Sequence, residues 1–348
     1  MAPVSRAARA GPPAANVPRR VPSKLFAKPG EFVESCVPEA LVYFLLNVGD
    51  GDTQLVLLPA RASGGRRALV VDVATTRKLP RLLEALGAAR LLVPLPDDVL
   101  FPLVVATHPH NDHIGGMPEF LAGYGRYVRE FWEPGYYNPI GGYIETMRVL
   151  EDADGAIQHT QPTSGTTRFI GKVKVQVLSP SIALRNRFDS YGIDINNSSI
   201  ALKLEFPASR VQWHKQGRRY VRVGERQGRL ILGADAQTRA GGKVMDDFPA
   251  LQESRSEAAK ALRMALGTDP LRADVFKIPH HGSKHGVNLE LVEEIRPAYS
   301  LVSSVGGGGE FNFPHLVAVE AVREAREPTT SSGSRHKPDW ELGIHFTG

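Results

Sequence analysis

Residues 107–116 read Thr-His-Pro-His-Asn-Asp-His-Ile-Gly-Gly, a dense group of metal-binding residue types. Three imidazoles and a carboxylate stand within six positions: His108, His110, Asp112 and His113. In an extended loop, His108 and His110 point to the same side, because side chains alternate with a period of two residues. Asp112 and His113 follow where the chain turns, so they face a second point. Since imidazole and carboxylate are the usual ligands of zinc and related metals, the spacing predicts one ligand pair for each of two metal ions.

The residues on either side place this stretch between a strand and a helix. An apolar run from Leu103 to Ala106 precedes it, which is typical of a buried strand. A helix-like segment from Met117 to Ala122 follows the two glycines. A polar loop whose histidines only cap a helix is the simpler interpretation. Four ligand-type residues in this order after a strand rarely arise by chance, so we interpret the loop as half of a metal centre.

The composition of the 348-residue chain fits a globular protein with a substantial core. Hydrophobic residues make up 42% of it, and the net charge of +5 permits an anionic substrate without demanding one. The single cysteine, Cys36, excludes an internal disulfide framework and a Cys-rich zinc site, and it fits a reducing compartment. We find no apolar run of membrane-spanning length and no secretory signal, so we expect a cytoplasmic protein without membrane contact.

Periodicity and composition divide the rest of the chain. Residues 1–24 are rich in Ala, Pro, Arg and Gly without periodicity, which predicts a disordered basic tail. We expect one domain at 25–348, with a basic hairpin insertion at 209–229 and a polar linker at 326–338 before a last strand. Strands are predicted at 40–48, 52–58, 68–73, 103–106, 124–132, 172–178, 229–235, 274–279, 299–303 and 340–346, with a further one beginning near 200. Helices are predicted at 77–92, 117–122, 144–152 and 254–266, and another opens near 315.

More ligand-type residues follow strands in the second half of the chain. The strand at 229–235 ends in glycine, alanine and Asp235, and His280 and His281 directly follow the strand at 274–279. Strands and helices thus alternate in two halves, each of which ends in metal ligands. Two sheets packed face to face would bring both ligand sets to one edge.

These motifs resemble a known family. The pattern His108-x-His110-x-Asp112-His113 resembles the signature of the metallo-β-lactamase superfamily. Residues 277–283, Lys-Ile-Pro-His-His-Gly-Ser, look like a segment of the β-lactamase-like domain of ComEC-type DNA-uptake proteins. The likeness covers roughly residues 41–315, without the membrane channel of those proteins. It implies an α/β fold, the metallo-β-lactamase αββα sandwich, in which two mixed sheets pack face to face with helices outside.

The resemblance also implies roles for single residues. It makes Asp235 a carboxylate that bridges both metals, and a shared anion would offset the repulsion between two dications. It makes one of the two adjacent histidines a ligand of the second metal, and by position we favour His280, with His281 as a further ligand or an acid. Asp72 would orient the metal loop from beneath, since a buried carboxylate is costly unless it is hydrogen-bonded. Asp52 belongs to a turn near the site.

Two positions depart from the family pattern. Many members place a third histidine of the first site where this chain has Asn196, whose amide would hold a cation or a water more weakly than imidazole does. The first site is therefore either incomplete or suited to Mn²⁺ or Mg²⁺, although Zn²⁺ is the expected metal; His159 is a remote substitute ligand. His315 follows a proline, whereas the family order is His-Pro; it would protonate a leaving group or bind the scissile phosphate, or simply start a helix.

Basic and polar residues near the motifs suggest contacts with a phosphate. Lys277, which we also count as a catalytic candidate, Ser283 and Lys284 would reach a phosphate oxygen. Arg218 and Arg219 belong to the basic hairpin, which either grips a phosphate backbone near the metals or is a solvated hairpin with charges that protect its edges.

A pair of divalent metal ions predicts hydrolysis, because the ions activate water and stabilise charge on the attacked centre. We expect a phosphodiesterase or nuclease that acts on DNA or RNA, with Asp112 holding the attacking water. Three alternatives stay open: a hydrolase of cyclic nucleotides, a hydrolase of β-lactams or thioesters, and a metal-stabilised binding module without activity.

Overall fold

The computed structural model describes residues 28–62, 64–94, 99–135, 138–182, 195–249, 256–306, 309, 311–327 and 337–347, so the predicted tail at 1–24 lies outside the described residues. Two sheets form its centre, and each is built from one continuous part of the chain. The first sheet has the order β1-β2-β3-β4-β5-β6 and contains β1 (Val42–Leu45), β2 (Thr53–Leu57), β3 (Ala68–Val73), β4 (Leu103–Val105), β5 (Glu130–Trp132) and β6 (Gln158–Thr160). The second has the order β13-β12-β11-β10-β9-β8-β7 and contains β7 (Thr167–Ile170), β8 (Val173–Ser179), β9 (Ala201–His214), β10 (Arg219–Leu232), β11 (Val275–Lys277), β12 (Tyr299–Val302) and β13 (Ile344–Phe346).

Both sheets mix antiparallel and parallel pairs in a similar way. In the first sheet β1, β2 and β3 are antiparallel, and β3 to β6 are parallel. In the second, β7 to β10 are antiparallel and β10 to β13 are parallel. Each sheet therefore has neighbouring parallel strands whose carboxyl ends open onto the same edge, where functional loops of α/β proteins gather.

Alternating side chains bury one face of each sheet against the other. Leu69 and Val71 of β3 face the second sheet, where Leu230 and Leu232 of β10 meet them in a shared apolar layer. Val70, between the first two, points to the opposite face and packs beneath helices. Burial on both faces explains why β3 is apolar almost throughout, apart from one acid.

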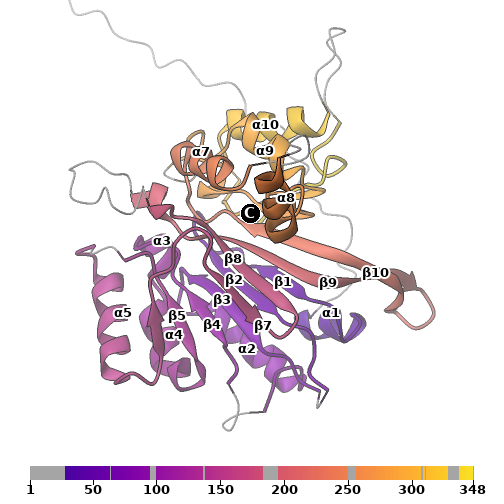
Figure 1. Cartoon of the computed structure of the whole chain (residues 1–348). Coiled ribbons are helices and arrows are strands. Elements are labelled where there is room, and N and C mark those ends of the chain that lie inside the picture. Colours follow the sequence, from indigo (N-terminus) through magenta and orange to yellow (C-terminus); the bar gives the residue numbers. More distant parts are fainter. Residues whose placement is uncertain are drawn as a thin grey trace, which may run out of the picture.

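Helices cover the two outer faces of the sheets (Figure 1). The first sheet packs against α1 (Pro29–Ser35), α2 (Lys78–Ala88), α4 (Met117–Tyr124) and α5 (Gly141–Asp152), and the second against α7 (Thr238–Asp247), α9 (Leu289–Ile295) and α10 (Leu316–Arg326). The other described helices are α8 (Glu257–Leu266), α3 (Asn111–Ile114) and the short 3-10 helices η1 (Gly125–Tyr127), η2 (Ile195–Ser198) and η3 (His280–Gly282). The predicted αββα sandwich is confirmed. Across the described residues, no helix combines the length and apolarity that a membrane crossing needs.

Two predicted strands begin four or more residues later in the structure. The strand expected at 124–132 begins only at Glu130, because Tyr124 still belongs to α4, where its ring stacks on Phe120 at 5.4 Å. The last strand begins at Ile344 rather than at 340, because residues 340–343 form a turn closed by the Ile344 N–H donating to the Asp339 carbonyl. Neither difference moves a ligand-bearing loop.

Candidate metal centre

A buried aspartate beneath the metal loop fixes its first residue and one of its histidines. Asp72 is the next-to-last residue of β3 and is fully buried. Its Oδ1 accepts a hydrogen bond from the Thr107 backbone N–H at 2.7 Å, and its Oδ2 accepts one from Thr107 Oγ1 at 2.7 Å. The same Oδ2 lies 2.8 Å from His113 Nδ1, which leaves Nε2 of that ring facing away from Asp72. This is the placement that the resemblance implies for Asp72, and a carboxylate so bound orients an imidazole toward a metal.

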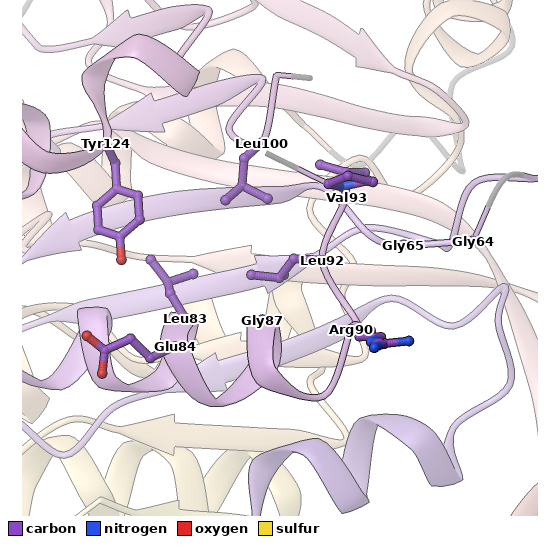
Figure 2. A pocket seen from close by; sticks show the side chains of 11 residues that line it. Gly64, Gly65, Leu83, Glu84, Gly87, Arg90, Leu92, Val93, Leu100 and Tyr124 are labelled. Carbon is purple, nitrogen blue, oxygen red and sulfur yellow. The ribbon is translucent and has the colours of Figure 1, made fainter. Parts of the chain in front are cut away.

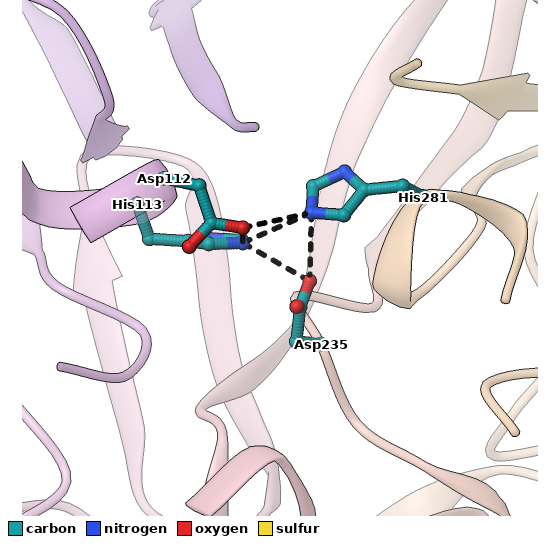
Figure 3. A group of neighbouring side chains, drawn as sticks. All are labelled: Asp112, His113, Asp235 and His281. Atoms are coloured by element: carbon teal, nitrogen blue, oxygen red, sulfur yellow. Dashed lines mark hydrogen bonds and ion pairs between the residues drawn. The ribbon is translucent and has the colours of Figure 1, made fainter. Parts of the chain in front are cut away.

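Four side chains from three separate segments converge beyond this point (Figure 3): Asp112, His113, Asp235 and His281, here called the Asp112 cluster. One ligand atom of each lies within 4.8 Å of the others. His113 Nε2 is 3.1 Å from Asp235 Oδ1 and 3.4 Å from His281 Nε2, and Asp112 Oδ2 is 3.5 Å from His281 Nε2. Three of the four are buried, whereas Asp112 is 42% exposed. The cluster is therefore open to solvent on the Asp112 side.

The other oxygen of Asp235 faces a second set of imidazoles. His108 Nε2 lies 3.1 Å from His110 Nδ1 and 3.7 Å from Asp235 Oδ2. His280 Nε2 approaches the same oxygen at 3.8 Å. Asp235 thus stands between two ligand groups with one oxygen toward each, which is the position that a bridging carboxylate needs.

The charges in this buried region depend on one another. Burial would raise the pKa of Asp235, but the neighbouring His113 and His281 lower it well below its ordinary value. Burial would lower the pKa of His113, yet Asp235 and Asp72 raise it well above the usual range. Burial, together with the charge of His113, lowers the pKa of His108, which keeps that imidazole neutral. Asp235 is therefore an anion and His108 is in the form that binds metals, whereas His113 must lose its proton before it can bind one.

The two adjacent histidines take roles that differ from the sequence-based preference. We favoured His280 for the second metal, but the structure places His281 in the Asp112 cluster and His280 on the other side of Asp235. His281 Nδ1 lies 2.9 Å from the Ser303 carbonyl, which turns Nε2 toward the cluster. Both residues have left-handed backbone angles, with φ of 52° and 54°, so the directions of their side chains do not follow from the strand that precedes them. Residue types alone do not reveal such a turn.

Lys277, predicted as a phosphate contact and a catalytic candidate, lies beneath the site rather than at its opening. Its side chain is fully buried, forms an ion pair with Asp52 Oδ2 and lies 3.4 Å from the Ala234 carbonyl. Asp52 is equally buried, and its backbone N–H donates to the Asp112 carbonyl at 3.0 Å. A β-carbon on the preceding residue, Gly51, would lie 2.5 Å from that carbonyl oxygen, so only glycine fits there. The pair supports the floor of the site, consistent with the supporting position expected for Asp52.

The other predicted phosphate contacts lie at the rim or below it. Ser283, predicted to reach a phosphate oxygen, is buried, and its Oγ accepts a hydrogen bond from the His285 N–H at 3.3 Å. Lys284 is exposed, and its backbone N–H donates to His315 Nδ1 at 3.0 Å. His315 therefore stands at the rim with Nδ1 engaged, and burial together with the charge of Lys284 lowers its pKa.

Phe313 is a part of the site that the sequence analysis missed. Its ring centre lies 5.5 Å from that of His280, 5.7 Å from that of His281 and 5.3 Å from that of His315. A buried aromatic ring in contact with three imidazoles limits how far each of them can rotate. Its place beside His315 in the sequence was the only available indication.

Arg218 and Arg219, predicted either to grip a phosphate backbone or to belong to a solvated hairpin, lie far from the metal ligands along the chain. They lie at the tip of the hairpin formed by β9 and β10, which projects from the body of the protein (Figure 1). β10 runs for 14 residues from Arg219 to Leu232 before the chain reaches Asp235. At 3.3 Å per residue this distance is about 43 Å. The basic tip and the metal centre therefore occupy opposite ends of one strand.

Asn196 and His159, the two candidates for the first site, are placed very differently. Asn196 belongs to η2 and is nearly buried, with Nδ2 3.4 Å from His280 Nε2. His159 belongs to β6, where its Nε2 lies 3.1 Å from Glu133 Oε1. Glu133 also accepts a hydrogen bond from Gln161 Nε2 at 2.6 Å. His159 thus belongs to a separate polar group and does not substitute for the missing histidine.

A surface hollow of about 640 Å³ lies elsewhere on the molecule (Figure 2). It is bounded by α2 and the segment that follows it, and its lining includes Leu83, Glu84, Leu100 and Tyr124. It shares no lining residue with the Asp112 cluster, so we assign it no part in the metal chemistry.

Comparisons with known proteins agree with the ligand pattern. The family model described as the metallo-beta-lactamase superfamily matches residues 52–163. ComE operon protein 3 of Bacillus subtilis (strain 168) is 21% identical over 304 residues, which are 84% of this chain and 32% of that protein. The chain therefore spans about a third of the length of this curated relative.

Solved structures give more distant likenesses. CmlA, a diiron beta-hydroxylase from Streptomyces venezuelae, is 12% identical, with 89% of this chain and 53% of that chain covered and a TM-score of 0.42. Human tRNase Z, short form, is 12% identical, with 75% and 91% covered and a TM-score of 0.36.

Proposed function

We propose that this chain, which carries a metallo-β-lactamase superfamily domain, is a metal-dependent phosphodiesterase that hydrolyses DNA or RNA. The observation that carries the proposal is the position of Asp235, a buried carboxylate with His113 and His281 near one oxygen and His108 near the other. A carboxylate in this position suits a pair of divalent ions, Zn²⁺ first and Mn²⁺ or Mg²⁺ as alternatives.

The residues of the chain have distinct tasks in the proposed reaction. When bound, the ions would lower the pKa of a water and stabilise the charge that develops on the phosphate. Asp112 is the solvent-exposed carboxylate of the cluster, so it is placed to hold and orient the attacking water as well as to bind metal. His315 stands at the rim, where it would bind the phosphate or donate a proton to the leaving oxygen.

The charge around the opening favours a phosphodiester over a neutral carbonyl compound. The exposed Lys284 and the half-buried His315 adjoin the metal-binding residues. Phosphodiester hydrolysis passes through a strongly anionic transition state, which the Lys284 cation would stabilise and to which His315 would offer an N–H donor. A β-lactam or a thioester would gain less from them. The proximity of His280 to Asp235 also argues against a binding module whose first site lacks a third imidazole.

The purified 348-residue chain, incubated with several substrates and metals, tests the proposal. Labelled single- and double-stranded DNA, RNA, cyclic dinucleotides, a chromogenic β-lactam and a thioester would each be offered with Mn²⁺, Mg²⁺ or Zn²⁺. We expect turnover of a nucleic acid and little or none of the β-lactam. Turnover of only the carbonyl compounds, or of nothing at all, would contradict the proposal.

A pair of matched variants checks where the activity comes from. Asp112→Asn should abolish turnover, because it removes the negative charge of the exposed ligand. Asp152→Asn makes the same chemical change at the exposed end of α5 and should leave turnover as in the wild type. Equal activity in both variants would assign the hydrolysis to a contaminant.

A further inference from the structure

The two neighbouring histidines after β11 lie on opposite sides of Asp235. We propose that His280 supplies the third imidazole of the metal site begun by His108 and His110, while His281 serves the Asp112 cluster. This inference rests on the metal pair of the proposed function and assigns each histidine to one ion. The incomplete first site expected from Asn196 is then completed from a different segment.

The distances around Asp235 separate the two assignments. His280 Nε2 is 3.8 Å from Oδ2, the oxygen that His108 Nε2 approaches at 3.7 Å. His281 Nε2 is 3.5 Å from Oδ1, the oxygen that His113 Nε2 approaches at 3.1 Å. Two donors on one tetrahedral zinc, each about 2.1 Å from it, are about 3.4 Å apart. Each histidine therefore lies within a few tenths of an ångström of donor spacing for its own oxygen of Asp235.

The backbone explains how adjacent residues reach different ions. His280 and His281 both have left-handed φ angles, of 52° and 54°, and their ring centres are 6.3 Å apart with the ring planes at 71°. The His280 N–H donates to the Ala234 carbonyl at 2.9 Å, directly beside Asp235. The Ser283 N–H in turn donates to the His280 carbonyl at 2.7 Å. These bonds hold an unfavourable backbone conformation that sends the two rings in different directions.

The surroundings of the His280 ring direct Nε2 toward the first site. Phe313 packs against one side of the ring at 5.5 Å between centres, and His280 is only 16% exposed. The Asn196 amide nitrogen lies 3.4 Å from Nε2, so this nitrogen faces the side of the site on which Asn196 lies. Asn196 stands where the family resemblance places the third histidine. His280 therefore reaches the same region from the opposite segment, and Asn196 contacts it.

Metal stoichiometry tests this assignment without depending on turnover. Wild type, His280→Ala, His281→Ala and His285→Ala would be loaded with Zn²⁺ or Co²⁺, freed of excess metal and analysed for metal content and for the Co²⁺ absorption spectrum. His285 is the matched control, because it is an exposed histidine in the same segment. We expect two ions per chain in wild type and His285→Ala, and one tightly bound ion in His280→Ala and in His281→Ala.

Double variants identify which ion each histidine holds. If His280 and His108 share an ion, His108→Ala/His280→Ala should keep one ion, as each single variant does. His280→Ala/His281→Ala should keep none. Two ions in His280→Ala at wild-type affinity, or one ion retained in His280→Ala/His281→Ala, would overturn the inference. Circular dichroism checks folding, and His280→Gln replaces His280→Ala throughout if the alanine variant does not fold.

These outcomes are separate from those of the proposed function. A fall from two ions to one in His280→Ala, in a protein that hydrolyses no phosphodiester, would uphold the ligand assignment and end the nuclease proposal. Nucleic-acid turnover by the wild type together with an unchanged metal content in His280→Ala would uphold the nuclease proposal and end the ligand assignment.

Discussion

Charged residues lie at both ends of β10, exposed to solvent at its start and buried just beyond its end. At its start, Arg219 is exposed at the hairpin tip, and Arg222 pairs with Glu225 on the surface of the same hairpin. Just beyond its other end, Asp235 is 1% exposed among imidazoles. A surface ion pair contributes little free energy, whereas a buried charge requires partners at defined distances. Charged residue types mark a site in this chain only where the fold buries them together.

The largest difference between the two ends should come from Asp235 itself. Asp235→Asn removes the negative charge between the two ligand groups, so we expect the loss of both metals. Turnover should fall by more than about 100-fold, which is a larger effect than the loss of a residue that only supports a ligand. Metal analysis and single-turnover kinetics would measure it. If Asp235→Asn retained both metals, the buried carboxylate beyond the end of β10 would matter no more for metal binding than the exposed charges at its start.

The buried pair beneath the site should give the next largest effect, on stability. Lys277→Met leaves Asp52 buried without its cation, which should lower the free energy of unfolding by about 3–5 kcal/mol. Denaturant unfolding measures it, and Asp52→Asn/Lys277→Met should recover part of the loss. A raised KM with unchanged stability would instead restore Lys277 as a substrate contact.

The support of His113 by Asp72 should have an intermediate effect on metal binding. Asp72→Asn weakens the hold on His113 Nδ1 and on Thr107, so metal affinity should fall by roughly 10–100-fold. Competition with a chromogenic chelator would measure the affinity of the Asp112 cluster. An affinity equal to that of the wild type would mean that Asp72 serves the fold alone.

The hairpin tip should give the smallest effect. Charges separated by more than about 10 Å of salt solution are screened, so Arg218→Ala/Arg219→Ala should change the turnover of a small chromogenic phosphodiester by less than about twofold. Steady-state kinetics at 0.15 M salt would show it. A tenfold loss with this small substrate would show that the tip acts on the metal centre, against the separation along β10.

The sequence predicts the fold well because strands and helices follow local patterns, whereas the ligand roles stay predictions. The spacing of His108, His110, Asp112 and His113 follows from the chemistry of metal binding. Apolar runs at strand positions, with acids and histidines where strands end, predict both ligand sets on one edge. The superfamily resemblance and the sandwich are confirmed by the family match and by the packing of the two sheets.

The differences between the expected and observed side-chain positions share one physical cause. The direction of a side chain depends on how other segments of the chain fold around it. The structure places His281 rather than His280 in the Asp112 cluster, where two consecutive left-handed residues turn the chain. Lys277 looks like a phosphate contact until the turn that carries Asp52 is folded against it. The positive charge of Arg218 and Arg219 does not show how far they lie from the site. The 14 residues of β10 separate them from it.

The division of the ligands between the sheets has a consequence for the timing of activity. Every strand of the first sheet precedes every strand of the second, and Asp235, His280 and His281 all belong to the second part of the chain. A growing polypeptide that has made only the first part therefore carries His108 to His113 as a harmless histidine-rich loop. The proposed metal pair therefore needs both parts of the chain, and its ligand set is complete only when the second part has folded against the first.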